Sequence, residues 1–113
     1  MMLGRVVLKI GVLGALALGP WVVQAADVAA GREKAQRACV ACHGADGHTT
    51  ASPSYPKLAG QHRDYLQVAL RDYQTGARKN AIMASQVQGL SRKDLADLAA
   101  YFASLPSSLR VEP

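Results

Sequence analysis

The chain has 113 residues, of which half are hydrophobic and only two are cysteines, and its formal net charge is +5. A chain of this length accommodates one small domain and is too short for two. Its positive charge does not indicate nucleic-acid binding, because no basic stripe with interleaved aromatic residues accompanies it.

The first 25 residues have the pattern of a secretory signal peptide. Arg5 and Lys9 precede an apolar run over residues 10–23, and small side chains stand at Val23 and Ala25, where signal peptidase requires them. The run is short for a membrane-spanning helix of roughly 20 residues, and Pro20 interrupts it. We therefore expect cleavage after Ala25, export to the periplasm, no stable membrane insertion, and a mature domain over residues 26–113.

A first helix is expected to run towards the two cysteines. Asp27 is suited to cap its N-terminus, and Gly31, Ala35 and either Ala38 or Cys39 recur at helical spacing. The charged residues between them occupy the other faces, where solvent is the ordinary environment. This helix should place the cysteines at its C-terminal end.

The cysteines and the next residue, Cys39, Cys42 and His43, form a C-x-x-C-H motif, the pattern of covalent attachment of c-type haem. Two thiols separated by two residues can reach both vinyl groups of one porphyrin, and the following imidazole then faces the iron. A thioredoxin-type dithiol would need a βαβ pattern nearby, and half of a zinc site would need two further ligands. The sequence shows neither. We therefore predict one covalently bound haem c, with His43 as an axial ligand.

The stretch 44–60 is rich in Gly, Thr, Ser and Pro, which predicts an irregular loop around one edge of the cofactor. A haem-ligating imidazole usually donates its second ring N–H to a carbonyl group. The carbonyl of Pro53 or of Pro56 is the expected acceptor for His43, and the sequence does not choose between them.

Two further helices are expected in the second half of the chain. One covers about 64–75 and ends at Gly76, and the other begins after Leu90 with Ser91 as its N-cap and ends before Pro106. Each has an apolar face at helical spacing: Leu66, Ala69, Leu70 and Tyr73 in the first, and Leu95, Leu98, Ala99 and Phe102 in the second. No strand pattern of useful length occurs, so the fold should be all-α.

Between these two helices we expect an irregular loop, 78–86, that holds Met83, the only methionine after the predicted signal peptide. A lone methionine usually fills space in a core. Here His43 takes one face of the iron, and a thioether from a later loop is the usual partner in haem proteins that carry electrons. We predict Met83 as the second axial ligand; His48, His62 and an open position are the alternatives.

Together these features resemble a small bacterial class I cytochrome c, similar to the single-haem cytochromes c-553 and to one half of the two-haem periplasmic cytochromes. The resemblance covers nearly all of 27–113 and rests on Gly31 eight residues before Cys39, the CVACHG motif, the run from Tyr55 to Gln61, Tyr65 with Leu66, Met83, and Leu98 with Tyr101.

The resemblance implies three main helices and loops wrapped around one covalently bound haem. It also implies that the first and third helices cross at Gly31, close to Leu98 and Tyr101, and that Leu58 packs on the haem. One departure is Ala35, because many mitochondrial-type relatives carry an aromatic residue four positions after this glycine.

The predicted function is a periplasmic carrier that moves single electrons between larger redox proteins, a donor dehydrogenase or reductase and an acceptor oxidase or reductase. Two ligands from the chain leave no position for a substrate, so we expect no enzymatic activity. The alternatives are an electron-accepting subunit of a dehydrogenase, and a haem sensor or enzyme with a displaceable Met83. Two arrangements stay open for Lys57, Arg63, Arg71, Arg78 and Lys79: a weak positive rim around the haem that orients an acidic partner, or a scattered, solvated surface.

Overall fold

The computed structural model describes residue 14, residues 19–20 and residues 24–107, so most of the predicted signal peptide lies outside the described residues. The described part contains five helices and no strand: α1 (Val28–Ala38), α2 (Val40–His43), α3 (Arg63–Thr75), α4 (Ala81–Val87) and α5 (Arg92–Ser104). Three of these are long, which confirms the expected all-α fold with three main helices. No helix among the described residues has the length and apolarity needed to cross a membrane.

Capping side chains set the helix ends where the sequence predicts them. The Asp27 carboxylate accepts a hydrogen bond from the Ala30 N–H at the start of α1. Ser91 and Asp94 form a reciprocal capping box at the start of α5. Gly76 ends α3 with a φ of 80°, a left-handed conformation that is open to glycine without strain. The helix ends therefore follow from local sequence.

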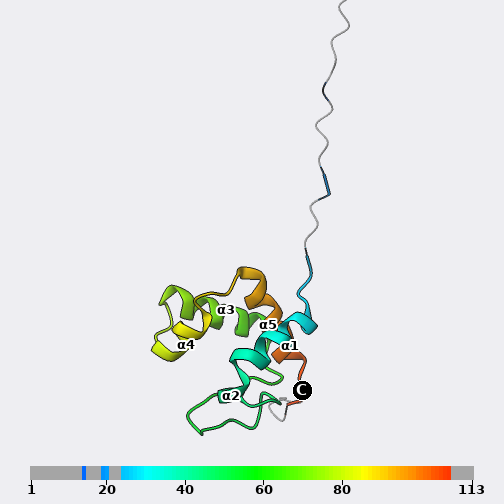
Figure 1. Cartoon of the computed structure of the whole chain (residues 1–113). Helices are drawn as coiled ribbons and strands as arrows, with labels where there is room; N and C mark the ends of the chain where they lie inside the picture. Colours follow the sequence, from blue (N-terminus) through cyan, green and yellow to red (C-terminus); the bar gives the residue numbers. More distant parts are fainter. Residues whose placement is uncertain (1–13, 15–18, 21–23, 108–113) are drawn as a thin grey trace, which may run out of the picture.

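The core lies where α1 and α3 pack against α5. Figure 1 shows α1 crossing α5, with α3 and α4 together on the other side of the domain. At the crossing, a Cβ atom on Gly31 would lie 2.0 Å from the Asp97 carbonyl oxygen and 2.9 Å from the Tyr101 Cβ. The two helices therefore cross at Gly31 with Tyr101 close by, as the resemblance implies. The atoms nearest to the added Cβ belong to the Asp97 backbone.

Asp97 is a buried carboxylate beside this crossing, with only 1 % of its surface exposed. It accepts hydrogen bonds from the Asp27 N–H at 2.8 Å and from the Lys93 ammonium at 2.7 Å. Burial by itself would raise the pKa of Asp97, but these two donors outweigh burial and hold the pKa below its usual value. The ionised side chain therefore ties the N-terminus of α1 to α5.

The loop between α2 and α3 closes on itself. The Gly47 carbonyl accepts hydrogen bonds from the N–H groups of Leu58 and Ala59, and the Gly60 N–H donates to the Phe102 carbonyl of α5. Ala51, inside the loop, donates its N–H to the Cys42 carbonyl. These bonds hold the base of the loop against α2 and α5, below the rest of the domain in Figure 1.

One expectation about local structure was wrong. The segment predicted as an irregular loop over 78–86 is largely taken up by the seven-residue helix α4, which ends at Val87 and packs against α3. Asn80 caps this helix, because its side-chain oxygen accepts a hydrogen bond from the Met83 N–H at 3.0 Å. Met83 consequently lies in the first turn of a capped helix.

Candidate cofactor site

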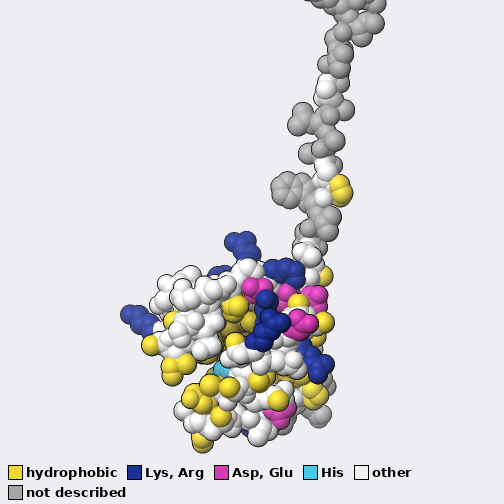
Figure 2. Space-filling model, in the orientation of Figure 1, with side chains coloured by type: hydrophobic (Ala, Val, Ile, Leu, Met, Phe, Trp, Pro, Cys, Tyr) yellow, Lys and Arg dark blue, Asp and Glu magenta, His cyan; other side chains and the backbone are white. Residues whose placement is uncertain are grey.

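A cavity of about 190 Å³ separates the end of α2 from α4. Figure 2 shows it as a hollow edged by hydrophobic side chains, with a histidine visible inside. Its apolar lining includes side chains from three helices and the loop: Leu58, Leu66, Leu70, Val87, Leu98 and Phe102. Leu58, which the resemblance places on the haem, does line this cavity. Walls of this kind suit a large, flat, apolar ligand.

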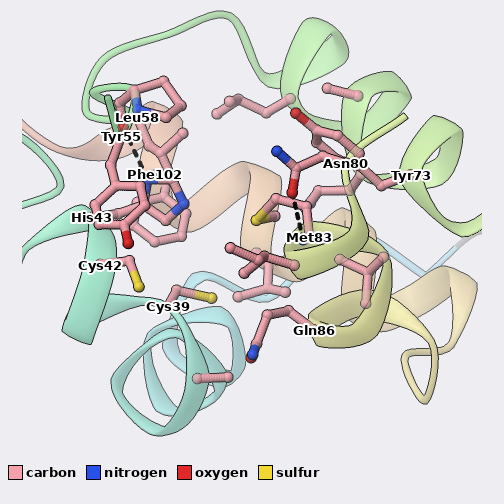
Figure 3. Close-up of a pocket in the computed structure, with 18 of the residues that line it drawn as sticks. Cys39, Cys42, His43, Tyr55, Leu58, Tyr73, Asn80, Met83, Gln86 and Phe102 are labelled. Atoms are coloured by element: carbon pink, nitrogen blue, oxygen red, sulfur yellow. Dashed lines mark hydrogen bonds between the residues drawn. The ribbon is translucent and has the colours of Figure 1, made fainter. Parts of the chain in front are cut away.

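One wall of the cavity carries the C-x-x-C-H motif. The chain breaks out of α1 at Cys39 and re-enters a short turn of helix, in which the N–H groups of Cys42 and His43 both return to the Cys39 carbonyl. This turn directs both sulfur atoms and the imidazole into the same space, as Figure 3 shows. The three side chains that the sequence predicts to act together therefore do lie together.

The His43 ring is fixed by one hydrogen bond. Its Nδ1–H donates to the Pro56 carbonyl at 2.8 Å, and the side chain is only 6 % exposed. Pro56, rather than Pro53, is thus the acceptor that the sequence left open. A carbonyl can only accept, so Nδ1 must carry the proton, and Nε2 keeps the lone pair needed to bind a metal.

The environment of Cys39 favours a neutral sulfur. Burial and, to a smaller extent, the neighbouring Cys42 raise the pKa of the Cys39 thiol to about 11. A thiol with this pKa is protonated at neutral pH and is a poor nucleophile, unlike the activated cysteine of a dithiol oxidoreductase. A thioether carries neither proton nor charge, so the same burial costs it little.

Met83 occupies the wall opposite His43. Its side chain is half-buried and lines the cavity. Figure 3 shows its sulfur pointing into the space that His43 faces from the other side, with the two cysteine sulfurs below this space in the view. Neither His48 nor His62, the alternatives to Met83, is among the described residues that line the cavity.

Only part of the predicted positive rim borders the cavity. Arg78 lines it, and its guanidinium donates to the Tyr65 hydroxyl and lies 5.1 Å from the centre of the Tyr73 ring. Lys34, which sequence reasoning missed, also lines it and pairs with Asp94. Of the other predicted rim residues, Arg63 and Arg71 lie beside the carboxylates that follow them in the sequence.

The donor set fits a haem better than a bare metal ion. Among the residues that the structure describes, no group of three or more His, Cys, Asp or Glu side chains is placed to hold a metal. The cavity instead combines apolar walls, two sulfurs for covalent attachment, and one nitrogen and one sulfur on opposite sides. This combination matches a porphyrin with two axial ligands.

A small all-α domain with this site belongs to the class of covalent haem proteins. The family model for cytochrome c matches residues 28–106, and the chain therefore belongs to the cytochrome c family. Its cofactor is haem c, one per chain, because the family binds this haem covalently and the sequence has a single attachment motif.

Individual relatives agree with the family model. The chain is 48 % identical to cytochrome c-554(548) of Halomonas halodenitrificans over 83 residues, which is 71 % of this chain and 98 % of that protein. It is 39 % identical to a thiosulfate dehydrogenase electron acceptor of Thiomonas intermedia, covering 96 % of this chain but 48 % of that protein.

A solved structure gives the same relationship. The crystal structure of reduced cytochrome c4 from Pseudomonas stutzeri matches with a TM-score of 0.67 and 41 % identity, over 74 % of this chain and 48 % of that one. The two-domain members of the cytochrome c4 group are two-haem proteins, and the described part of this chain corresponds to a single cytochrome c domain. The chain thus spans about half the length of these longer relatives.

Proposed function

We propose that this protein is a one-electron carrier whose haem c is attached through Cys39 and Cys42 and ligated by His43 and Met83. The observation that carries the proposal is the opposition of His43 and Met83 across one apolar cavity whose wall also holds both cysteines (Figure 3). When bound, the haem supplies an iron that alternates between the ferrous and ferric states. The chain supplies both axial ligands and thereby leaves no position for a substrate.

The protein environment favours a carrier because it limits rearrangement. The Pro56 carbonyl holds the imidazole in one tautomer and one orientation, and the Asn80 side chain fixes the first turn of α4 beneath Met83. A neutral thioether stabilises ferrous iron and raises the reduction potential. Both ligands are thus carried on short helices held by specific hydrogen bonds, which keeps the geometry similar in the two oxidation states.

Export and partners belong to the same proposal. We place the protein in the periplasm after removal of residues 1–25, with larger redox proteins as donor and acceptor. The relatives that are electron-transfer cytochromes support a carrier over an enzyme. Exposed apolar side chains at the cavity, Tyr65 and Ile82, offer the partner a contact near the cofactor.

The experiment that tests this proposal replaces Met83. The mature wild-type protein should exceed its polypeptide mass by one haem, and its oxidised form should show the weak far-red band of sulfur-to-iron charge transfer. Met83→Ala should abolish that band, lower the potential and allow carbon monoxide to bind the reduced protein. A wild-type protein that lacks the band and binds carbon monoxide readily would favour a sensor or enzyme with an open sixth position.

A second candidate is an electron-accepting partner of a dehydrogenase. It is favoured by the Thiomonas intermedia relative, whose name describes an electron acceptor for thiosulfate dehydrogenase and whose match covers most of this chain. Reduction rates of the purified protein with different dehydrogenases separate the two candidates. A dedicated acceptor should react with one enzyme at least about a hundredfold faster than with the others, which corresponds to nearly 3 kcal/mol of discrimination.

A further inference from the structure

Among the described residues, the long-range side-chain hydrogen bonds to the segment that carries Met83, residues 80–90, come from a single side chain. Arg78, just before this segment, contacts Tyr65 and Tyr73 of α3. Helix α4 packs against α3, and the Asn80 cap acts only within its own turn. The side chain of Gln74, on the last turn of α3, reaches across to the far end of the segment. Its Nε2 donates hydrogen bonds to the Val87 carbonyl at 2.6 Å and to the Leu90 carbonyl at 2.8 Å.

These two bonds use the whole donor capacity of the amide. Both partners are carbonyl oxygens, so the NH₂ group must point at them, and each of its hydrogens has an acceptor. Val87 is the last residue of α4 and is buried, and Leu90 is half-buried just before α5. The Val87 carbonyl also accepts the Leu90 N–H, so Gln74 adds a second hydrogen bond there and one to the Leu90 carbonyl, which ties the turn after α4 to α3.

The geometry assigns Gln74 as the positioning residue that keeps Met83 on the iron, an inference that rests on Met83 being the ligand, as proposed above. The Asn80 side chain holds the first turn of α4, and Gln74 ties the C-terminal end of α4 to α3, whose residues also line the cavity. Without Gln74, the segment retains its internal hydrogen bonds but loses this clamp. The expected effect is easier opening of α4 as a unit, with Met83 leaving the iron more often.

An external ligand measures this opening. Imidazole binds the ferric iron only when Met83 is displaced, and the apparent affinity of a ligand for a rarely populated state scales with that population. The loss of two partly buried hydrogen bonds should raise the open population, and hence the apparent affinity for imidazole, by about tenfold or more. The far-red charge-transfer band should weaken in parallel, and the reduction potential should fall.

Three holoprotein variants separate positioning from general stability. Gln74→Leu removes the donors, and Gln74→Glu keeps the side-chain volume but directs oxygen at the two carbonyls. Gln67→Leu is the matched control, since Gln67 lies on the same helix, is half-buried, and its side chain makes no hydrogen bond to the described residues. Each variant is titrated with imidazole in its oxidised form, and its unfolding by guanidinium is measured.

The inference is supported when both Gln74 variants bind imidazole at least about tenfold more tightly than wild type and Gln67→Leu stays within about twofold. It is overturned when a Gln74 variant loses stability but keeps wild-type imidazole affinity, because Gln74 would then support the fold alone. If Gln74→Leu does not fold, Gln74→Glu decides by the same criterion. A wild-type protein without the charge-transfer band overturns both this inference and the proposed ligation by Met83, whereas an intact band with unchanged affinities overturns this inference only.

Discussion

Replacement of Gly31 by alanine tests the crossing of α1 and α5. The added Cβ would lie 2.0 Å from the Asp97 carbonyl oxygen, whereas real Cβ contacts stay beyond 3.0 Å, so the two helices must separate by about 1 Å. Overpacking lowers the free energy of unfolding by about 1–3 kcal/mol. The clashing atom is a backbone carbonyl oxygen, which cannot rotate away as a side chain could, so we expect a loss near the upper end of this range. Alanine returns about 1 kcal/mol through its higher helix propensity. We expect a net loss of about 2 kcal/mol.

The assays are guanidinium unfolding and thermal unfolding of the holoprotein, each followed by far-UV circular dichroism and by haem absorbance. A loss of about 2 kcal/mol should lower the melting temperature by roughly 10 °C in a domain of this size. Gly89→Ala is the control, because nothing lies within 4 Å of the added atom and its φ is not positive; it should be neutral or slightly stabilising. Equal stability of Gly31→Ala and Gly89→Ala would refute the reasoning about the crossing.

Two further predictions concern Asp97 and the cysteines. Because the folded-state pKa of Asp97 is lowered, its contribution is present above the ordinary carboxylate pKa of about 4 and is lost as the pH falls below it. Asp97→Asn should therefore lower the free energy of unfolding by about 1–3 kcal/mol at pH 7, and its difference from wild type should shrink below pH of about 4. A difference that stays constant with pH would contradict a lowered pKa of Asp97 in the folded state. Replacement of both Cys39 and Cys42 by alanine should prevent covalent attachment and leave a largely unfolded chain, because so small a domain depends on the haem for much of its packing. Native-like circular dichroism of that variant without haem would show that the polypeptide core suffices.

The long helices were predictable because their signals are local. Asp27 and Ser91 cap helices that begin at the next residue, and the predicted start of α3 at 64 differs by one residue from its start at Arg63. The C-x-x-C-H motif likewise places three side chains through adjacency alone. Met83 could be proposed as a ligand without knowledge of its surroundings, since no other methionine follows the predicted signal peptide.

The remaining features depend on contacts between distant segments. Helix α4 is too short to show an apolar stripe, although Asn80 three residues before Met83 is a capping signal that could have indicated it. The choice of Pro56 over Pro53 depends on how the loop folds back on α2, which no periodic pattern encodes. Gln74 looks like an ordinary polar position on α3, and its role appears only when Val87 and Leu90 are placed beside it.

The closed base of the loop between α2 and α3 has a practical consequence for engineering. The Gly47 carbonyl accepts hydrogen bonds from Leu58 and Ala59, and His43 donates to Pro56, whereas the exposed tip at Pro53 takes part in none of these bonds and does not line the cavity. The entropy of closing a loop grows only with the logarithm of its length. This tip is accordingly a natural insertion point for a tether to an electrode surface or for a reporter sequence, attached near the haem without altering its ligands.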